Sequence, residues 1–182
     1  RSLFLSVVLG PLAALTRDII QFDETPYTRM AENPLLGHNP LDITGLSATH
    51  AAILYPLVTA SFSVFWHNYV AAGYIVSVLF SSLIILPTYM FGKVMWNRRV
   101  ATAAAALVAV LPVMVDFGSI VDGQNLFAFW LMCALFFGYR MQFTKRCMWG
   151  LISGTCLGLA YLCNPLALSF LVGLCTFMVF VG

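Results

Sequence analysis

Long apolar runs, interrupted by short polar breaks, are the feature that most constrains how this chain folds. The runs cover residues 3–15, 51–66, 69–96, 100–115, 126–139, 148–163 and 166–181. A helix that crosses a bilayer needs about 20 residues, with roughly 17 as the lower limit. These runs reach or approach that length, and a segment in lipid must satisfy its own backbone groups, as a helix does. The pattern predicts an all-α fold, a polytopic membrane helical bundle.

The scarcity of charged residues supports this prediction. Of the 182 residues, 61% are hydrophobic and only 9% are charged, whereas soluble domains carry roughly 25% charged residues. The net charge of +2 is small and the basic residues are scattered, so no nucleic-acid partner is expected. The five cysteines lie in or beside apolar runs without metal-type spacing, which favours packing roles. Because the first residue is Arg1 and not Met, and the last apolar run ends at Val181 without a basic flank, we expect the chain to be the N-terminal part of a longer protein.

Charge also predicts the orientation of the helices, because Lys and Arg concentrate in cytoplasmic loops. Six of the nine basic residues fall at two of the breaks: Lys93, Arg98, Arg99, Arg140, Lys145 and Arg146. One span leads from the first of these clusters to the loop 116–124, and the next span returns to the second cluster. Both clusters are therefore predicted on the cytosolic side, with Asp116 and Asp122 on the non-cytosolic side.

The run 51–66 is predicted not to span the membrane. If it crossed the bilayer, the segment 17–49 would lie in the cytosol, although it holds five acidic residues against Arg17 and Arg29. That placement fits the distribution of basic residues poorly. We therefore expect 51–66 to lie along the outer face, packed on the bundle.

The resulting architecture has one long outer loop followed by a helical bundle. A first span, shortened at its start, is expected at 1–16, and an outer loop with two surface helices at 17–68. The remaining membrane segments are expected at 69–96, 99–116, 124–140, 147–163 and 166–182. The protein is thus expected to be an integral, multi-pass protein in contact with membrane lipid, in a prokaryotic plasma membrane or the endoplasmic reticulum.

Acidic residues in two separate outer loops are the candidates for chemistry. Asp23 and Glu24 open the first surface helix, and Asp122 lies in the short second loop, near the membrane surface. Asp23 and Asp122 can be helix N-caps, and Glu24 can complement the helix dipole. Carboxylates that share one face can also act as a general base or hold a divalent metal ion. Capping and function both stay open for these residues.

Motifs for nucleotide or zinc binding do not occur. The sequence has no Walker glycine loop, no GxGxxG and no HExxH. A sugar nucleotide therefore has no recognisable binding site. His50 begins the second surface helix, where a single histidine is more typical of a packed or solvated residue than of a ligand.

The order of several motifs resembles the GT-C superfamily of membrane glycosyltransferases, and most of all family 39, which includes protein mannosyltransferases and lipid A aminoarabinose transferases. Those proteins begin with one helix and an outer loop that opens with an Asp-Glu pair, as Asp23-Glu24 does here. Further similarities are Pro87-Thr88-Tyr89-Met90-Phe91-Gly92-Lys93 at the end of a span, the Ala-rich segment before Pro112, and Gly154 and Gly158 followed by Asn164-Pro165. The first loop also partly matches oligosaccharyltransferase catalytic subunits.

The resemblance implies inverting transfer of a sugar from a polyprenyl- or dolichyl-phosphate donor to a protein, lipid or glycan acceptor at the non-cytosolic face. Asp23 would be the general base, and Glu24 and Asp122 would orient groups or hold a divalent ion. Arg29 and His50 would contact the donor phosphate. The cofactor stays unknown, because Ala48-Thr49-His50-Ala51 stands where aminoarabinose transferases carry a Glu-Lys-Pro stretch. An oligosaccharyltransferase-like subunit, a membrane transporter and a non-catalytic scaffold remain the alternatives.

Overall fold

The computed structural model describes residues 53–66 and 68–181, and every described element is a helix. This confirms the all-α membrane bundle. The expected first span and the first surface helix lie outside the described residues. The helices are α3 (Leu54–Trp66), α4 (Tyr69–Leu83), α5 (Ile85–Met95), α6 (Arg98–Val110), α7 (Pro112–Gly118), α8 (Gln124–Thr144), α9 (Cys147–Cys163) and α10 (Ala167–Val181).

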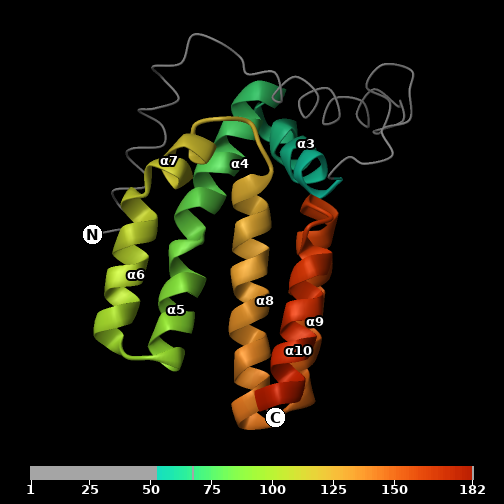
Figure 1. The fold of residues 1–182 in the computed structure, drawn as a ribbon. Coiled ribbons are helices and arrows are strands. Elements are labelled where there is room, and N and C mark those ends of the chain that lie inside the picture. The colour runs from blue at the N-terminus through green and yellow to red at the C-terminus, as the bar shows by residue number, and fades with distance from the viewer. Residues whose placement is uncertain (1–52, 67, 182) are drawn as a thin grey trace.

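The bundle has two chemically different ends (Figure 1). One end is formed by α3, α7 and the connection 119–123, and it is called the acidic end because α7 and this connection carry Asp116 and Asp122. The α5–α6 and α8–α9 connections lie at the opposite end, called the basic end. The six clustered basic residues belong to the helix ends and turns there: Lys93, Arg98, Arg99, Arg140, Lys145 and Arg146.

Two helices are long and apolar enough to cross a membrane. They are α8 and the nearly continuous pair α4–α5, which together cover Tyr69–Met95. A third span is possible if α6 and α7 count as one, although a 53° bend separates them. The shorter helices α9 and α10 are apolar, so their expected roles as full membrane segments stay predictions. At 13 residues, α3 would reach only about 20 Å along its axis.

The bend between α6 and α7 has a local cause in Pro112. Leu111 adopts an extended backbone (φ −64°, ψ 120°), and Pro112 begins the next helix. Proline has no N–H for the helical hydrogen bond and disfavours the helical conformation of the preceding residue. The segment expected at 99–116 is therefore two helices, and α7 turns toward the acidic end (Figure 1).

The hairpin of α5 and α6 is held together by small residues. Ala101, Ala105 and Ala109 recur every four residues and are buried, and they form one face of α6. A Cβ added at Gly92 of α5 would lie 3.1 Å from the Cα of Ala101. Small side chains let helix backbones approach closely in a membrane, where the hydrophobic effect does not drive helices together.

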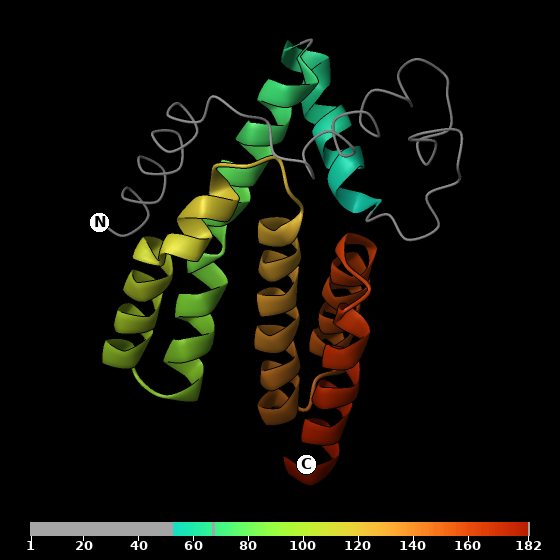
Figure 2. The same cartoon turned by 45° about the horizontal axis from the view of Figure 1, so that its top comes forward.

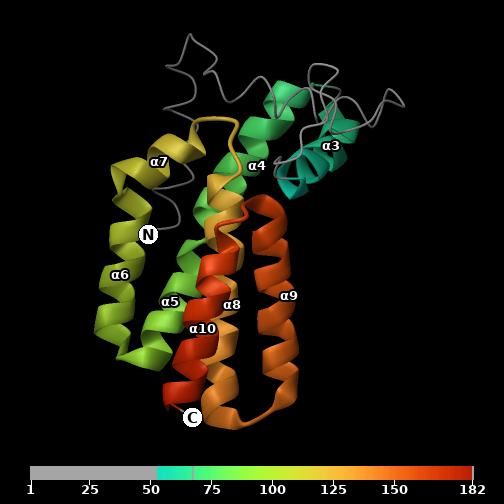
Figure 3. The same cartoon turned by 45° about the vertical axis from the view of Figure 1, so that its right-hand side comes forward.

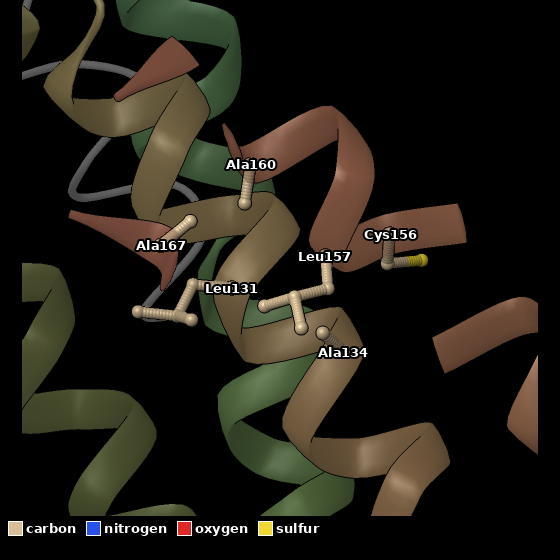
Figure 4. Packing of buried hydrophobic residues seen from close by; sticks show 6 residues of the cluster. All are labelled: Leu131, Ala134, Cys156, Leu157, Ala160 and Ala167. Atoms are coloured by element: carbon tan, nitrogen blue, oxygen red, sulfur yellow. The ribbon is translucent and has the colours of Figure 1, made fainter. Parts of the chain in front are cut away.

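The α8–α9 interface is apolar and contains one hydrogen bond between the helices. Leu131 and Ala134 of α8 pack against Cys156, Leu157 and Ala160 of α9, together with Ala167 of α10 (Figure 4). Ser153 of α9, also buried, donates a 2.7 Å hydrogen bond to the carbonyl oxygen of Ala134. Seen from the side, α10 runs down beside α8 (Figure 3).

Two of the three glycines of α9, Gly154 and Gly158, lie away from this interface. A Cβ added at Gly154 or Gly158 would meet no atom within 4 Å in the described structure, whereas one at Gly150 would meet Met141. The spacing of these three glycines permits close helix packing, but Gly154 and Gly158 line an open apolar groove of about 270 Å³ with residues of α9 and α10. Within the described residues, no atom fills the space next to these two glycines.

Candidate active site

The connection between α7 and α8 carries Asp122 and is unusually well buried. Ser119, Ile120 and Val121 are each less than one tenth exposed, while Asp122 is partly exposed. Backbone groups in such a loop need partners. The Ser119 N–H and hydroxyl both donate to the Asp116 carbonyl oxygen, at 2.9 and 2.7 Å, and the Asp122 N–H donates to the Ile120 carbonyl oxygen at 3.1 Å. The loop therefore holds Asp122 at a fixed place at the acidic end.

Helix α3 is attached to α4 beside this loop through Tyr55. Its side chain is completely buried. The Tyr55 hydroxyl donates to the carbonyl oxygen of Gly73 at 3.0 Å and lies 2.8 Å from the Ser77 hydroxyl. The Ser77 Oγ in turn lies 3.5 Å from the carbonyl oxygen of Asp122. Figure 2 shows α3 and α4 converging at this end of the bundle.

Two glycines allow the loop to approach these helices. A Cβ added at Gly73 would lie 2.6 Å from the Val121 Cγ1, which is closer than real contacts allow. A Cβ at Gly123 would lie 3.3 Å from the Tyr55 Cβ. The residues on both sides of Asp122 thus pack directly against α4 and α3.

Two further polar side chains lie buried near the same loop. Ser81, one turn after Ser77 on α4, donates a 3.1 Å hydrogen bond to the Met114 carbonyl oxygen of α7. Asn125, in the first turn of α8, is 1% exposed, and neither atom of its amide group has a hydrogen-bond partner in the described part of the chain. A row of hydroxyls and an amide therefore surrounds the carboxylate-bearing loop.

Of the predicted site residues, the structure describes only Asp122. Asp23, Glu24, Arg29 and His50 lie outside the described residues, so their grouping with Asp122 stays a prediction. Within 53–66 and 68–181, no three His, Cys, Asp or Glu side chains come close enough to hold a metal ion.

Tyr55, Ser77 and Asn125 were not predicted as parts of the site. A single polar residue in an apolar helix gives a weak signal, because it is usually a packing residue. The spacing of Ser77 and Ser81 at i and i+4 is the one usable pattern, since it places both hydroxyls on the same face of α4. Tyr55 and Asn125 carry no comparable pattern.

Comparison with known families decides the assignment. A family model described as dolichyl-phosphate-mannose-protein mannosyltransferase matches residues 49–182. The chain belongs to this family. It is accordingly a glycosyltransferase of the GT-C type, related to mannosyltransferases, and an integral membrane protein. No curated protein and no solved structure matches the chain.

The match to the mannosyltransferase family covers only some of the predicted site residues. It begins at residue 49 and so includes His50, Asp122 and the whole described bundle. Asp23, Glu24 and Arg29 precede the matched range. The similarity to family 39 that the motifs predict is confirmed, while the roles of the individual residues stay predictions.

Proposed function

We propose that this protein transfers a sugar from a polyprenyl- or dolichyl-phosphate donor to a hydroxyl group of a protein, lipid or glycan acceptor. The reaction inverts the anomeric carbon and takes place at the non-cytosolic face of the membrane. Two observations support the proposal. The chain belongs to the mannosyltransferase family, and at the acidic end Asp122 lies on a buried loop that packs against α3 and α4. The segment with Asp23 and His50 leads directly into α3.

In the proposed reaction, a carboxylate takes the proton of the acceptor hydroxyl while the acceptor oxygen attacks the anomeric carbon. The bond between that carbon and the phosphate oxygen breaks, and polyprenyl phosphate leaves. Asp23 acts as the general base. Arg29 and His50 stabilise the negative charge that grows on the leaving phosphate. Glu24 and Asp122 orient the reacting groups.

A lipid-linked donor agrees with the shape and composition of the chain. The lipid tail remains in the bilayer, so the head group reaches a site at one end of the helices. A nucleotide-binding motif is then unnecessary, and the sequence has no GxGxxG or Walker loop. The opposite, basic end would face the cytosol, because Lys and Arg concentrate on that side of membrane proteins.

The transporter alternative finds no support in the described helices. A transport path is marked by ionisable groups inside the spans. The buried polar side chains of the described residues are all neutral: Thr59, Ser63, Ser77, Ser81, Ser82, Ser119, Asn125 and Ser153. The polar groups near α3, α4 and α7 instead gather at one end.

The proposal is tested with the full-length protein in membranes or nanodiscs, supplied with polyprenyl-phosphate mannose and a membrane extract as acceptor. The release of polyprenyl phosphate is measured. Asp23→Asn should reduce turnover at least about 100-fold, which is the usual contribution of a general base, and it should leave membrane insertion intact. Asp42→Asn, another acid of the same predicted loop, is the matched control. Normal turnover by Asp23→Asn would refute the assignment of the base, and no donor consumption by the unmodified protein would refute the function.

A further inference from the structure

We propose that Tyr55 and Gly73 are positioning residues for Asp122, so that the surface helix α3 sets the place of the second carboxylate-bearing loop. This inference rests on the proposed function, because it assigns a role to residues that support the same site. Tyr55 lies 18 residues before Gly73 and 22 before Ser77 in the chain. The contact therefore links three separate segments: α3, α4 and the α7–α8 loop.

The hydroxyl groups of Tyr55 and Ser77 act as one unit. Each supplies one proton, and three acceptors compete for the two protons: the Gly73 carbonyl, the Asp122 carbonyl and the partner hydroxyl. If Tyr55 donates to Gly73, Ser77 can donate either to Tyr55 or toward Asp122; if Tyr55 donates to Ser77, the Ser77 proton is directed toward Asp122. At 3.5 Å the contact between Ser77 and Asp122 is at the outer limit of a hydrogen bond, so it contributes less than the other two.

Packing provides the stronger connection to the loop. Gly73 leaves room for Val121, and Gly123 lies against Tyr55, so the residues on both sides of Asp122 are in contact with the helices. Both Tyr55 and Val121 are completely buried. A closely packed interior transmits a displacement instead of absorbing it, and a shift of α3 would therefore move the Asp122 backbone.

The serines of α4 provide a matched control for the hydroxyl network. The Ser82 hydroxyl is also buried, but it donates only to Val78 of its own helix, at 2.9 Å. Replacing it by alanine removes the same group without a contact to the loop. For the packing contact, Gly158 of α9 is the matched control for Gly73, because a Cβ added there meets nothing within 4 Å in the described structure.

The test compares kcat and KM for the lipid-linked sugar in the full-length protein. Tyr55→Phe keeps the ring and removes only the hydroxyl; it should lower kcat about tenfold, the effect of one lost buried hydrogen bond, with KM little changed. Gly73→Ala should lower kcat further, since its methyl group would displace Val121. Ser82→Ala and Gly158→Ala should behave like the unmodified protein. If Gly73→Ala does not fold, Tyr55→Phe alone decides the outcome.

Combination with Asp122→Asn distinguishes a positioning role from a purely structural one. If Tyr55 acts through Asp122, the double variant loses no more activity than Asp122→Asn alone. Multiplying losses would overturn the inference, and so would normal kcat in Tyr55→Phe. An Asp122→Asn variant with normal turnover would overturn it as well, because nothing would then need positioning. These outcomes are separate from failure of the proposed function, which would appear as no donor consumption by the unmodified protein.

Discussion

The two ends of the bundle handle polar groups in opposite ways. At the acidic end, the polar side chains Tyr55, Ser77 and Ser119 are buried and bonded to one another or to backbone carbonyls. At the basic end, most of the charged side chains are exposed, namely Lys93, Arg98, Arg99, Lys145 and Arg146. Arg140 is partly covered and lies over the ring of Trp149, with its Cζ 4.8 Å from the ring centroid.

This difference supports the proposal that the chemistry takes place at the acidic end. Burying a polar group costs free energy unless it is hydrogen-bonded, so a protein retains such groups mainly where they fix a geometry. Exposed Lys and Arg next to a membrane need no fixed partner, and their placement is explained by topology alone. The buried polar groups therefore agree with a proposed site at the acidic end, and the exposed Lys and Arg agree with a solvated membrane boundary at the basic end.

The largest expected difference between the ends is in how much stability is lost when an aromatic side chain is removed. Tyr55 at the acidic end is 0% exposed, and Trp96 at the basic end is 59% exposed. Tyr55→Ala should lower the free energy of unfolding by about 3–5 kcal/mol, as for other buried aromatic residues. Trp96→Ala should change it by about 0.5 kcal/mol. Unfolding in detergent micelles measures both values, and equal losses would show that burial does not distinguish the two ends.

A second, smaller difference concerns the unpaired amide of Asn125. It is buried at the acidic end without a hydrogen-bond partner in the described part of the chain. An unsatisfied buried amide costs about 1–3 kcal/mol. Asn125→Leu should therefore raise the free energy of unfolding by about that amount, measured in the same detergent. A loss of stability would contradict this and would mean that the amide has a partner, such as a bound water, in the intact protein.

The sequence predicted those parts of the fold that depend on the lengths of the apolar runs and on the positions of the charged residues. The length of the apolar runs was sufficient to predict a helical bundle, and the charges near residues 93–99 and 140–146 predicted two turns that share one end. The bend between Val110 and Pro112 was not predicted, because a proline can either end or only kink a helix. The glycine spacing of α9 was uninformative for a similar reason: it permits close packing but does not determine which face meets a partner.

The site was less predictable than the fold. Asp122 could be recognised because an ionisable residue stands in a short loop between two apolar runs. The link of Tyr55 and Ser77 to this loop could not be predicted, because their contact joins residues that are 22 positions apart, and the contact of Ser77 with Asp122 spans 45 positions. Such pairs depend on how α3 and α4 pack, and no local pattern of the sequence encodes that packing.

The smallest predicted effect lies in the turn between α8 and α9 at the basic end. Lys145 is the only non-glycine residue with positive φ among the described residues (φ 52°), and it ends α8 by donating its N–H to the Met141 carbonyl oxygen at 2.8 Å. Glycine adopts this left-handed conformation without the steric cost that a Cβ carries. Lys145→Gly should therefore raise the free energy of unfolding by about 0.5–1 kcal/mol.

Arg146→Gly is the matched control, because it removes the same charge from the same turn, but at a φ of −95° that any residue adopts. It should lower the stability slightly, since glycine makes the unfolded chain more flexible. If both variants change the free energy of unfolding by the same amount, the loss of charge and not the backbone conformation determines the stability of this turn. The charged side chains of the basic end would then contribute to stability.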